Sequence, residues 1–178
     1  MKLADQYIHF AEALSEKTGS IIQWLTTIMV AVVCIDVITR YLFKNSSVAI
    51  QELEWHLFSL IFLLGAAYTL KADRHVRVDV FYSNFSERNK ALVNFIGILL
   101  FLIPFSIVII SGSFNFVMNS FRILETSPDP GGLPARFLLK ACIPISFILV
   151  LIQGIALALK SLFCIIESKE QTREVSNG

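Results

Sequence analysis

The first residue that could do chemistry in this 178-residue chain is Asp36, which lies within a long apolar segment. Arg40 follows four residues later, so on a helix the two side chains share a face and can form an ion pair. An ionisable group in apolar surroundings can carry a proton or a cation. The plainer interpretation is a structural ion pair, and Arg40 favours it because a neighbouring guanidinium keeps a carboxylate charged and occupied.

A second polar group consists of Glu52, Glu54 and Trp55, with His56 directly behind them. Acidic residues in a first turn complement the positive end of a helix, and tryptophan favours the boundary between water and lipid. These preferences account for the group without any function. The alternative is that the two acids help to bind another protein.

Residues 75–79 read His-Val-Arg-Val-Asp, so the three polar side chains alternate with two valines. In an extended chain this places His75, Arg77 and Asp79 on one face. A histidine and an aspartate could bind a metal ion, but nothing nearby supplies the further ligands. We therefore expect a hydrogen-bonded turn here, and neither a metal site nor a cofactor.

Residues 127–134 read Ser-Pro-Asp-Pro-Gly-Gly-Leu-Pro, with Asp129 near the middle. Proline fixes φ and glycine permits tight turning, so this segment predicts a loop of defined shape. Such a loop could be a docking surface for a protein, or simply the connection into the following helix.

The composition indicates that the elements holding these residues are membrane helices. Hydrophobic residues make up 55% of the chain and the mean hydropathy is +0.68. Charged residues make up only 16%, against about 25% in soluble domains. The net charge of +1 excludes a nucleic-acid binder of the basic kind. The three cysteines show no zinc-site or disulfide-scaffold spacing.

The apolar segments predict an all-α integral membrane protein with four transmembrane helices. A hydrocarbon core of about 30 Å needs about 20 helical residues. The expected spans are about 20–43, 48–70, 90–118 and 135–161. Pro104 lies near the middle of the third span, where we expect a kink. Arg136 and Lys140 fall in the first turns of the fourth.

Polar segments flank the transmembrane domain, which is expected over residues 19–166. Residues 1–18 show apolar positions at helical spacing, so we expect an amphipathic helix on the cytoplasmic membrane surface. This segment does not resemble a signal peptide. Residues 167–178 are predicted to form a polar, disordered cytoplasmic tail.

The placement of basic residues predicts the orientation. Ten of the 15 Lys and Arg residues lie in the N-terminal segment, the connection between the second and third spans, and the C-terminal end. With four spans these three regions share one side of the membrane. The excess predicts that both termini are cytoplasmic.

Two other classes of protein remain open at this stage. One is a stand-alone, homodimeric, cation-coupled transporter that uses Asp36. The other is a four-helix membrane enzyme of the glutathione-using kind, which would hold a thiolate with a group of arginines and a tyrosine: Arg74, Arg77, Arg88 and Tyr82. The chain lacks a Walker motif, a Ser/His/Asp constellation and the repeated halves of many transporters. We therefore expect a partner subunit and not an enzyme.

Taken together, the motifs resemble the small membrane (Q) subunit of tripartite ATP-independent periplasmic (TRAP) transporters, the DctQ family. The resemblance runs from about residue 19 to residue 159. It rests on the four spans and on Arg40-Tyr41, the acidic-aromatic start of the second span, Gly65-Ala66-Ala67, residues 75–79, and Gly131-Gly132-Leu133-Pro134.

The resemblance implies a bacterial inner-membrane protein that assembles with a large membrane subunit, which carries substrate and ions. It also implies a periplasmic substrate-binding protein that delivers an organic acid or similar solute, with uptake driven by a sodium gradient. The small subunit would act as a scaffold and help to dock the binding protein. The candidate interface residues are Asp36, Arg40, Glu52, Glu54, Trp55, His75, Arg77, Asp79 and Asp129.

Overall fold

The chain is built from long helices in a computed structural model that describes residues 2–72 and 85–177, the last nine of these by backbone only. The elements are α1 (Lys2–Leu42), α2 (Val48–Lys71), α4 (Glu87–Gly97), the π-helix η1 (Ile98–Leu102), α5 (Ile103–Arg122) and α6 (Arg136–Asn177). Four helical stretches are long and apolar enough to cross a membrane: Lys2–Leu42, Val48–Lys71, Glu87–Arg122 and Arg136–Ser168. The predicted all-α, four-span class is confirmed.

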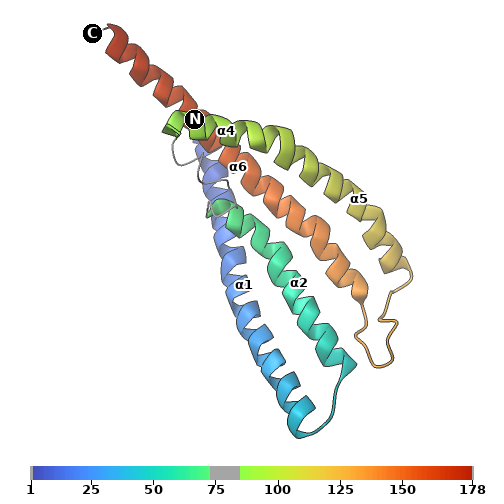
Figure 1. Ribbon diagram of the computed structural model, residues 1–178. Coiled ribbons are helices and arrows are strands. Elements are labelled where there is room, and N and C mark those ends of the chain that lie inside the picture. The colour runs from blue at the N-terminus through green and yellow to red at the C-terminus, as the bar shows by residue number, and fades with distance from the viewer. Residues whose placement is uncertain (1, 73–84, 178) are drawn as a thin grey trace.

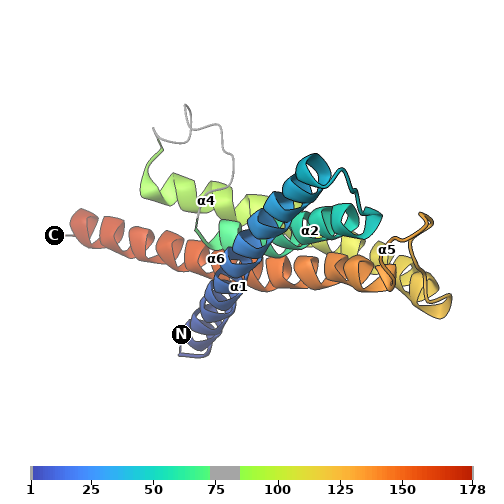
Figure 2. The same ribbon diagram turned by 90° about the horizontal axis from the view of Figure 1, so that it is seen from below.

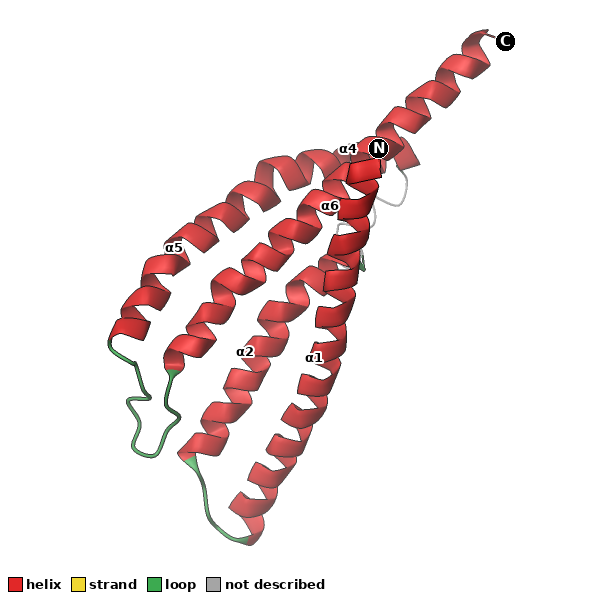
Figure 3. Ribbon diagram, turned by 180° about the vertical axis from the view of Figure 1, so that it is seen from behind, coloured by secondary structure: helices red, strands yellow, loops and turns green. Residues whose placement is uncertain are grey.

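The helices lie side by side in the order α1, α2, α6, α5 (Figures 1 and 3). Helix α6 is central, since α2 packs on one side of it and α4 and α5 pack on the other. Seen from below, α1 crosses α6 obliquely (Figure 2). This open row leaves the faces of most helices uncovered, and the span of α6 is the most buried of the four.

Helix α1 does not begin with a separate surface helix. It runs without a break from Lys2 to Leu42, so residues 2–18 are not set apart from the first span. Near its start, Ile8 and Ala11 pack against Ala156 of α6. Gly19 does not interrupt the helix. It admits the Tyr68 ring, which lies 2.6 Å from where a Cβ would stand.

The third span bends where the sequence predicts a kink. Pro104 lies in the first turn of α5, directly after the π-helix η1. Proline has no N–H to donate to the preceding turn, and a π-bulge absorbs that loss within a continuous helix. The resulting curve between α4 and α5 is visible in Figure 1.

The two ends of the row of helices contain different parts of the chain. The N-terminus and the start of α4 lie at one end of the row, and α6 projects beyond that end (Figure 1). The connections 43–47 and 123–135 lie together at the other end, called here the loop end. Helix α6 continues through residues 167–177, so the expected disorder of this tail is wrong. Glu, Lys, Gln and Arg favour helix, and residues 167–177 contain no proline or glycine to stop it.

Candidate functional site

Glu52 is the centre of a polar cluster at the loop end. It lies in the first turns of α2, and only 4% of its surface is exposed. One carboxylate oxygen accepts a hydrogen bond from the Ser127 hydroxyl, and the other accepts one from the backbone N–H of Leu133 at 2.5 Å. The Arg136 guanidinium lies 3.8 Å from the first oxygen. We call these four residues, with Trp55, the Glu52 cluster.

Aromatic rings close the cluster on the α2 side. The Arg136 guanidinium lies 5.5 Å from the centre of the Trp55 ring, within the range of a cation–π contact. The His56 ring lies 4.0 Å from that of Trp55, and its Nδ1 is 2.6 Å from the backbone oxygen of Glu52. The buried carboxylate is thus balanced by one guanidinium and by hydrogen-bond donors.

The loop held by Glu52 has the defined shape that its prolines and glycines predict. The Ser127 N–H donates to the Leu133 carbonyl at 3.1 Å, and the Gly132 N–H donates to the Asp129 carbonyl at 3.0 Å. Gly131 adopts a φ of +81°, which favours glycine. A Cβ at Gly132 would lie 2.4 Å from the Ser127 hydroxyl and 2.8 Å from Glu52, so only glycine lets the loop approach the carboxylate.

A second ion pair fixes the base of this loop. Glu125 pairs with Lys140 of α6, and the Glu125 carbonyl accepts from the Arg136 N–H at 2.9 Å. The Lys140 ammonium holds the pKa of the Glu125 carboxyl below its usual range. Leu124 and Ala135, at the two ends of the loop, have φ values of +48° and +62°. Residues other than glycine rarely adopt this backbone conformation, so the contacts of Glu125 hold a strained backbone in place.

The predicted pair of Asp36 and Arg40 is present near the loop end of α1. One oxygen of Asp36 pairs with the Arg40 guanidinium. Asp36 is 2% exposed, and its other carboxylate oxygen has no partner within the described residues. The Arg40 side chain is 45% exposed, so the charge of the pair reaches the surface through the arginine.

The other interface candidates from the sequence differ in where they lie relative to the Glu52 cluster. Glu52 and Trp55 belong to the cluster, whereas Glu54 is outside it and has a buried carboxylate oxygen with no partner in the described part of the chain. Asp129 is exposed on the loop. His75, Arg77 and Asp79 lie outside the described residues.

Four residues at this site were not predicted from the sequence to belong to it: Ser127, Glu125, Arg136 and Lys140. The sequence partly indicates them, because Arg136 and Lys140 are charged residues at the start of an apolar span and require partners. The choice of Glu52 and Glu125 as those partners depends on how α2, α5 and α6 meet at the loop end.

The cluster has the properties of a structural clamp. Among the side chains that the structure describes, those of residues 2–72 and 85–168, no group of three or more His, Cys, Asp or Glu could hold a metal ion. The carboxylates of Glu52 and Glu125 and one oxygen of Asp36 are engaged by cations of the same chain. The arrangement can hold the loop rigidly and present Asp129 on it.

Four membrane helices in an open row, joined at one end by a clamped loop, define a polytopic helical membrane protein. Comparison with known families identifies the family within this class. The family described as tripartite ATP-independent periplasmic transporters, DctQ component, matches residues 29–164. The chain belongs to this family, a component of transporters. It is also 26% identical over 126 residues to a Haemophilus influenzae protein named as a TRAP transporter small permease. That match covers 71% of this chain and 78% of the relative.

Proposed function

We propose that this chain is the small permease subunit of a TRAP transporter, which supports the large membrane subunit and helps to dock the periplasmic substrate-binding protein. Membership of the DctQ family supports the subunit assignment. In this proposal the protein lies in the bacterial inner membrane with both termini in the cytoplasm. The loop end then faces the periplasm, where the binding protein is found.

The observation that carries the scaffold role is the open row of helices. In the most apolar window of each span, the fraction of residues buried within the chain ranges from 6% in α1 to 28% in α6. A self-contained transporter encloses its substrate between helices, whereas this row leaves most of its surface for lipid or a partner. The ion pairs of Asp36, Glu52 and Glu125 engage residues of the same chain, which suits a rigid support.

The docking role concerns the loop end. The clamped loop presents the exposed Asp129, and Arg40 offers an exposed cation on α1. Charges on a preformed surface steer a partner and fix its orientation. Glu52 would act indirectly, by holding the loop that bears Asp129. Uptake of an organic acid, driven by a sodium gradient, would depend on the large subunit.

Reconstitution tests the proposal directly. Vesicles containing this chain alone should show no solute flux, even with an imposed sodium gradient. Vesicles that also contain the large subunit should take up solute when the binding protein is added outside. Flux through the chain alone would contradict the scaffold role, and uptake of equal rate without this chain would show that it is dispensable.

A further inference from the structure

Helix α5, at one edge of the row, has a polar face that is not covered by the rest of the chain. At 3.6 residues per turn, six exposed positions of this helix fall within an arc of about 100°. They are Val108, Ser111, Gly112, Asn115, Asn119 and Arg122. We call these six residues the outer face of α5. Only one of them is a large apolar residue, although the helix belongs to a membrane span.

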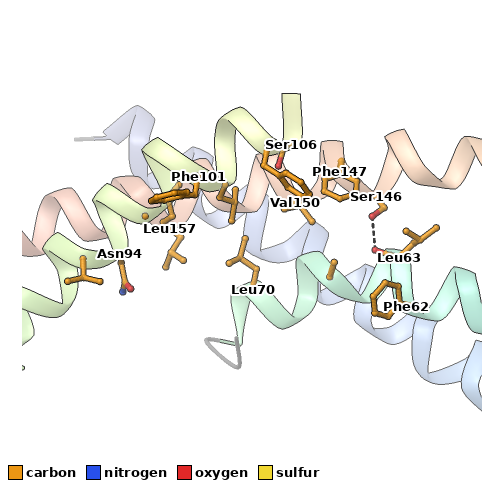
Figure 4. A pocket seen from close by; sticks show the side chains of 16 residues that line it. Phe62, Leu63, Leu70, Asn94, Phe101, Ser106, Ser146, Phe147, Val150 and Leu157 are labelled. Atoms are coloured by element: carbon orange, nitrogen blue, oxygen red, sulfur yellow. Dashed lines mark hydrogen bonds between the residues drawn. The ribbon is translucent and has the colours of Figure 1, made fainter. Parts of the chain in front are cut away.

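The opposite side of α5 is already occupied. Ser106, Ser113 and Ser120 recur there every seven residues and are buried, and α5 packs against α6. Ser106 lies near Phe147 and Val150 of α6 (Figure 4). Packing within the chain therefore accounts for the inner side of α5 and leaves the outer face unexplained.

Asn115 lies at the depth of the hydrocarbon core. Helix α5 ends at Arg122, and Asn115 stands seven residues earlier, about 10 Å along the helix. Gly112 is about 15 Å from Arg122, near the middle of a core of about 30 Å. The Asn115 amide is exposed and makes no hydrogen bond within the described residues. Lipid tails offer neither donors nor acceptors, so contact with lipid is unfavourable for this amide.

Other exposed surfaces of the row suit lipid better. On α5 itself the residues beside the outer face are apolar, among them Phe105 and Phe114. On α1, at the other edge, the exposed Ser20 and Thr27 hydroxyls donate to carbonyls of their own helix, and Gln23 is the one exposed amide of the span. The outer face of α5 is thus the surface whose polarity most requires protein contacts.

We propose that the outer face of α5 packs against a transmembrane helix of the large membrane subunit. This inference rests on the proposed function, since it names the surface through which the small subunit holds its partner. Helices in membranes associate through small residues, which permit close approach, and through side chains that hydrogen-bond across the interface. Gly112 provides the close approach, because a Cβ there would meet nothing within 4 Å. Asn115 provides the hydrogen-bonding group.

The charge of Arg122 argues against a second copy of this chain as the partner. Arg122 is exposed and forms no ion pair within the described part of the chain. Two copies related by a two-fold axis in one membrane have the same orientation, so paired α5 helices would bring the two Arg122 side chains to the same height. Like charges across an interface are unfavourable. The partner helix should instead present an acidic side chain near Arg122 and a hydrogen-bonding group facing Asn115.

Asn115→Leu separates a protein partner from lipid by the sign of its effect. If the outer face met lipid, the change would remove an unfavourable amide and leave assembly intact. Against a partner helix it removes a hydrogen bond, so the large subunit recovered with the tagged small subunit in mild detergent should fall about threefold to tenfold. The variant alone should unfold at the same temperature as the wild type or higher, which shows that it folds.

A matched pair of phenylalanine substitutions tests the position of the interface. Gly112→Phe adds a large ring to the outer face and should lower recovery of the large subunit at least as much as Asn115→Leu, because overpacking a close contact is destabilising. Cys34→Phe adds the same ring at an exposed position of α1, on the other edge of the row, and should match the wild type. The proposal fails if either α5 variant assembles normally, or if Cys34→Phe lowers recovery as much as they do.

A photoreactive residue identifies what covers the outer face. Val108 is 65% exposed, so p-benzoylphenylalanine at this position faces the occupant. Irradiation of the assembled transporter should give an adduct with the large subunit. An adduct with the mass of a phospholipid, or with a second copy of this chain, would overturn the proposal. The proposed function would still stand in that case if reconstituted uptake required this chain.

Discussion

The carboxylate of Glu52 accepts a hydrogen bond at 2.5 Å from the backbone N–H of Leu133, 81 residues further along the chain. This contact joins the start of α2 to the loop that leads into α6. Since the same carboxylate also engages Ser127 and Arg136, one side chain fixes both the shape of the loop and its position.

Glu52→Ala should release this loop. Removal of the carboxylate leaves the Leu133 N–H and the Arg136 guanidinium without their acceptor, and unpaired buried donors are costly. Limited proteolysis within residues 123–135 should become severalfold faster, and docking of the binding protein should weaken. Glu54→Ala is the matched control, because Glu54 lies outside the cluster, and it should leave cleavage unchanged. Equal cleavage of both variants would contradict the clamp.

Two neighbouring glycines should respond differently to alanine. Gly131→Ala introduces a Cβ at a φ of +81° in open space, so it should cost about 1–2 kcal/mol of backbone strain and leave the cluster intact. Gly132→Ala forces a Cβ against Ser127 and Glu52 and should separate the loop from α2. Proteolysis as above should distinguish them, with faster cleavage for Gly132→Ala. The reverse order would show that strain, not contact with Glu52, decides the loop's shape.

Two buried serines, Ser106 on α5 and Ser146 on α6, provide a prediction about buried hydroxyls. The Ser146 hydroxyl donates to the Leu63 carbonyl at 2.8 Å, whereas the fully buried Ser106 hydroxyl has no partner within the described residues. Ser146→Ala should lower the free energy of unfolding by about 0.6 kcal/mol, the average for hydrogen bonds between membrane helices. Ser106→Ala should be neutral or stabilising, because it removes an unsatisfied group. Thermal unfolding in detergent checks both, and a larger loss for Ser106→Ala would refute this assignment.

The sequence predicts four helices able to cross a membrane because lipid imposes a strong constraint on length and hydropathy. The second span was expected from residue 48, and α2 begins at Val48. The kink at Pro104 followed from the missing N–H of proline. The surface helix over residues 1–18 was not confirmed, because Gly19 does not end α1 and the first turns of α1 pack on α6.

The site was predicted only in part, since its contacts are long-range. The pair of Asp36 and Arg40 could be predicted because both lie on one helix. The clamp could not, because nothing local links Glu52 to Ser127 or Leu133. The position of α6 between α2 and α5 could not be predicted either, because hydropathy does not encode the order of the helices.

Asp36→Asn should lower the stability and assembly of the protein more than it alters ion coupling. The change removes the ion pair with Arg40, and a hydrogen bond to a charged group contributes about 1.5–3 kcal/mol. We expect a value near the lower end, because Arg40 is 45% exposed and water can replace its partner. The yield of assembled complex should fall, while the sodium dependence of the remaining uptake should match the wild type. Normal assembly with loss of sodium dependence would instead make Asp36 a coupling group.

Glu125 makes the stability of the loop end depend on pH. The Lys140 ammonium lowers the pKa of this carboxyl in the folded protein, whereas the unfolded chain should titrate near the ordinary value of about 4.3. A lowered folded pKa stabilises the protein fully above the unfolded value, and this stabilisation is lost as the pH falls through the folded value. Glu125→Gln lacks the charge, so its unfolding temperature should lie below that of the wild type at pH 7. The difference should stay constant down to about pH 5 and then shrink in more acidic solution.

Glu87→Gln, which removes an exposed carboxylate paired with Lys90, should show little difference at any pH. A gap between wild type and Glu125→Gln that widened below pH 4 would mean that the carboxyl is stabilised in its protonated form, and that the pair with Lys140 does not hold the base of the loop.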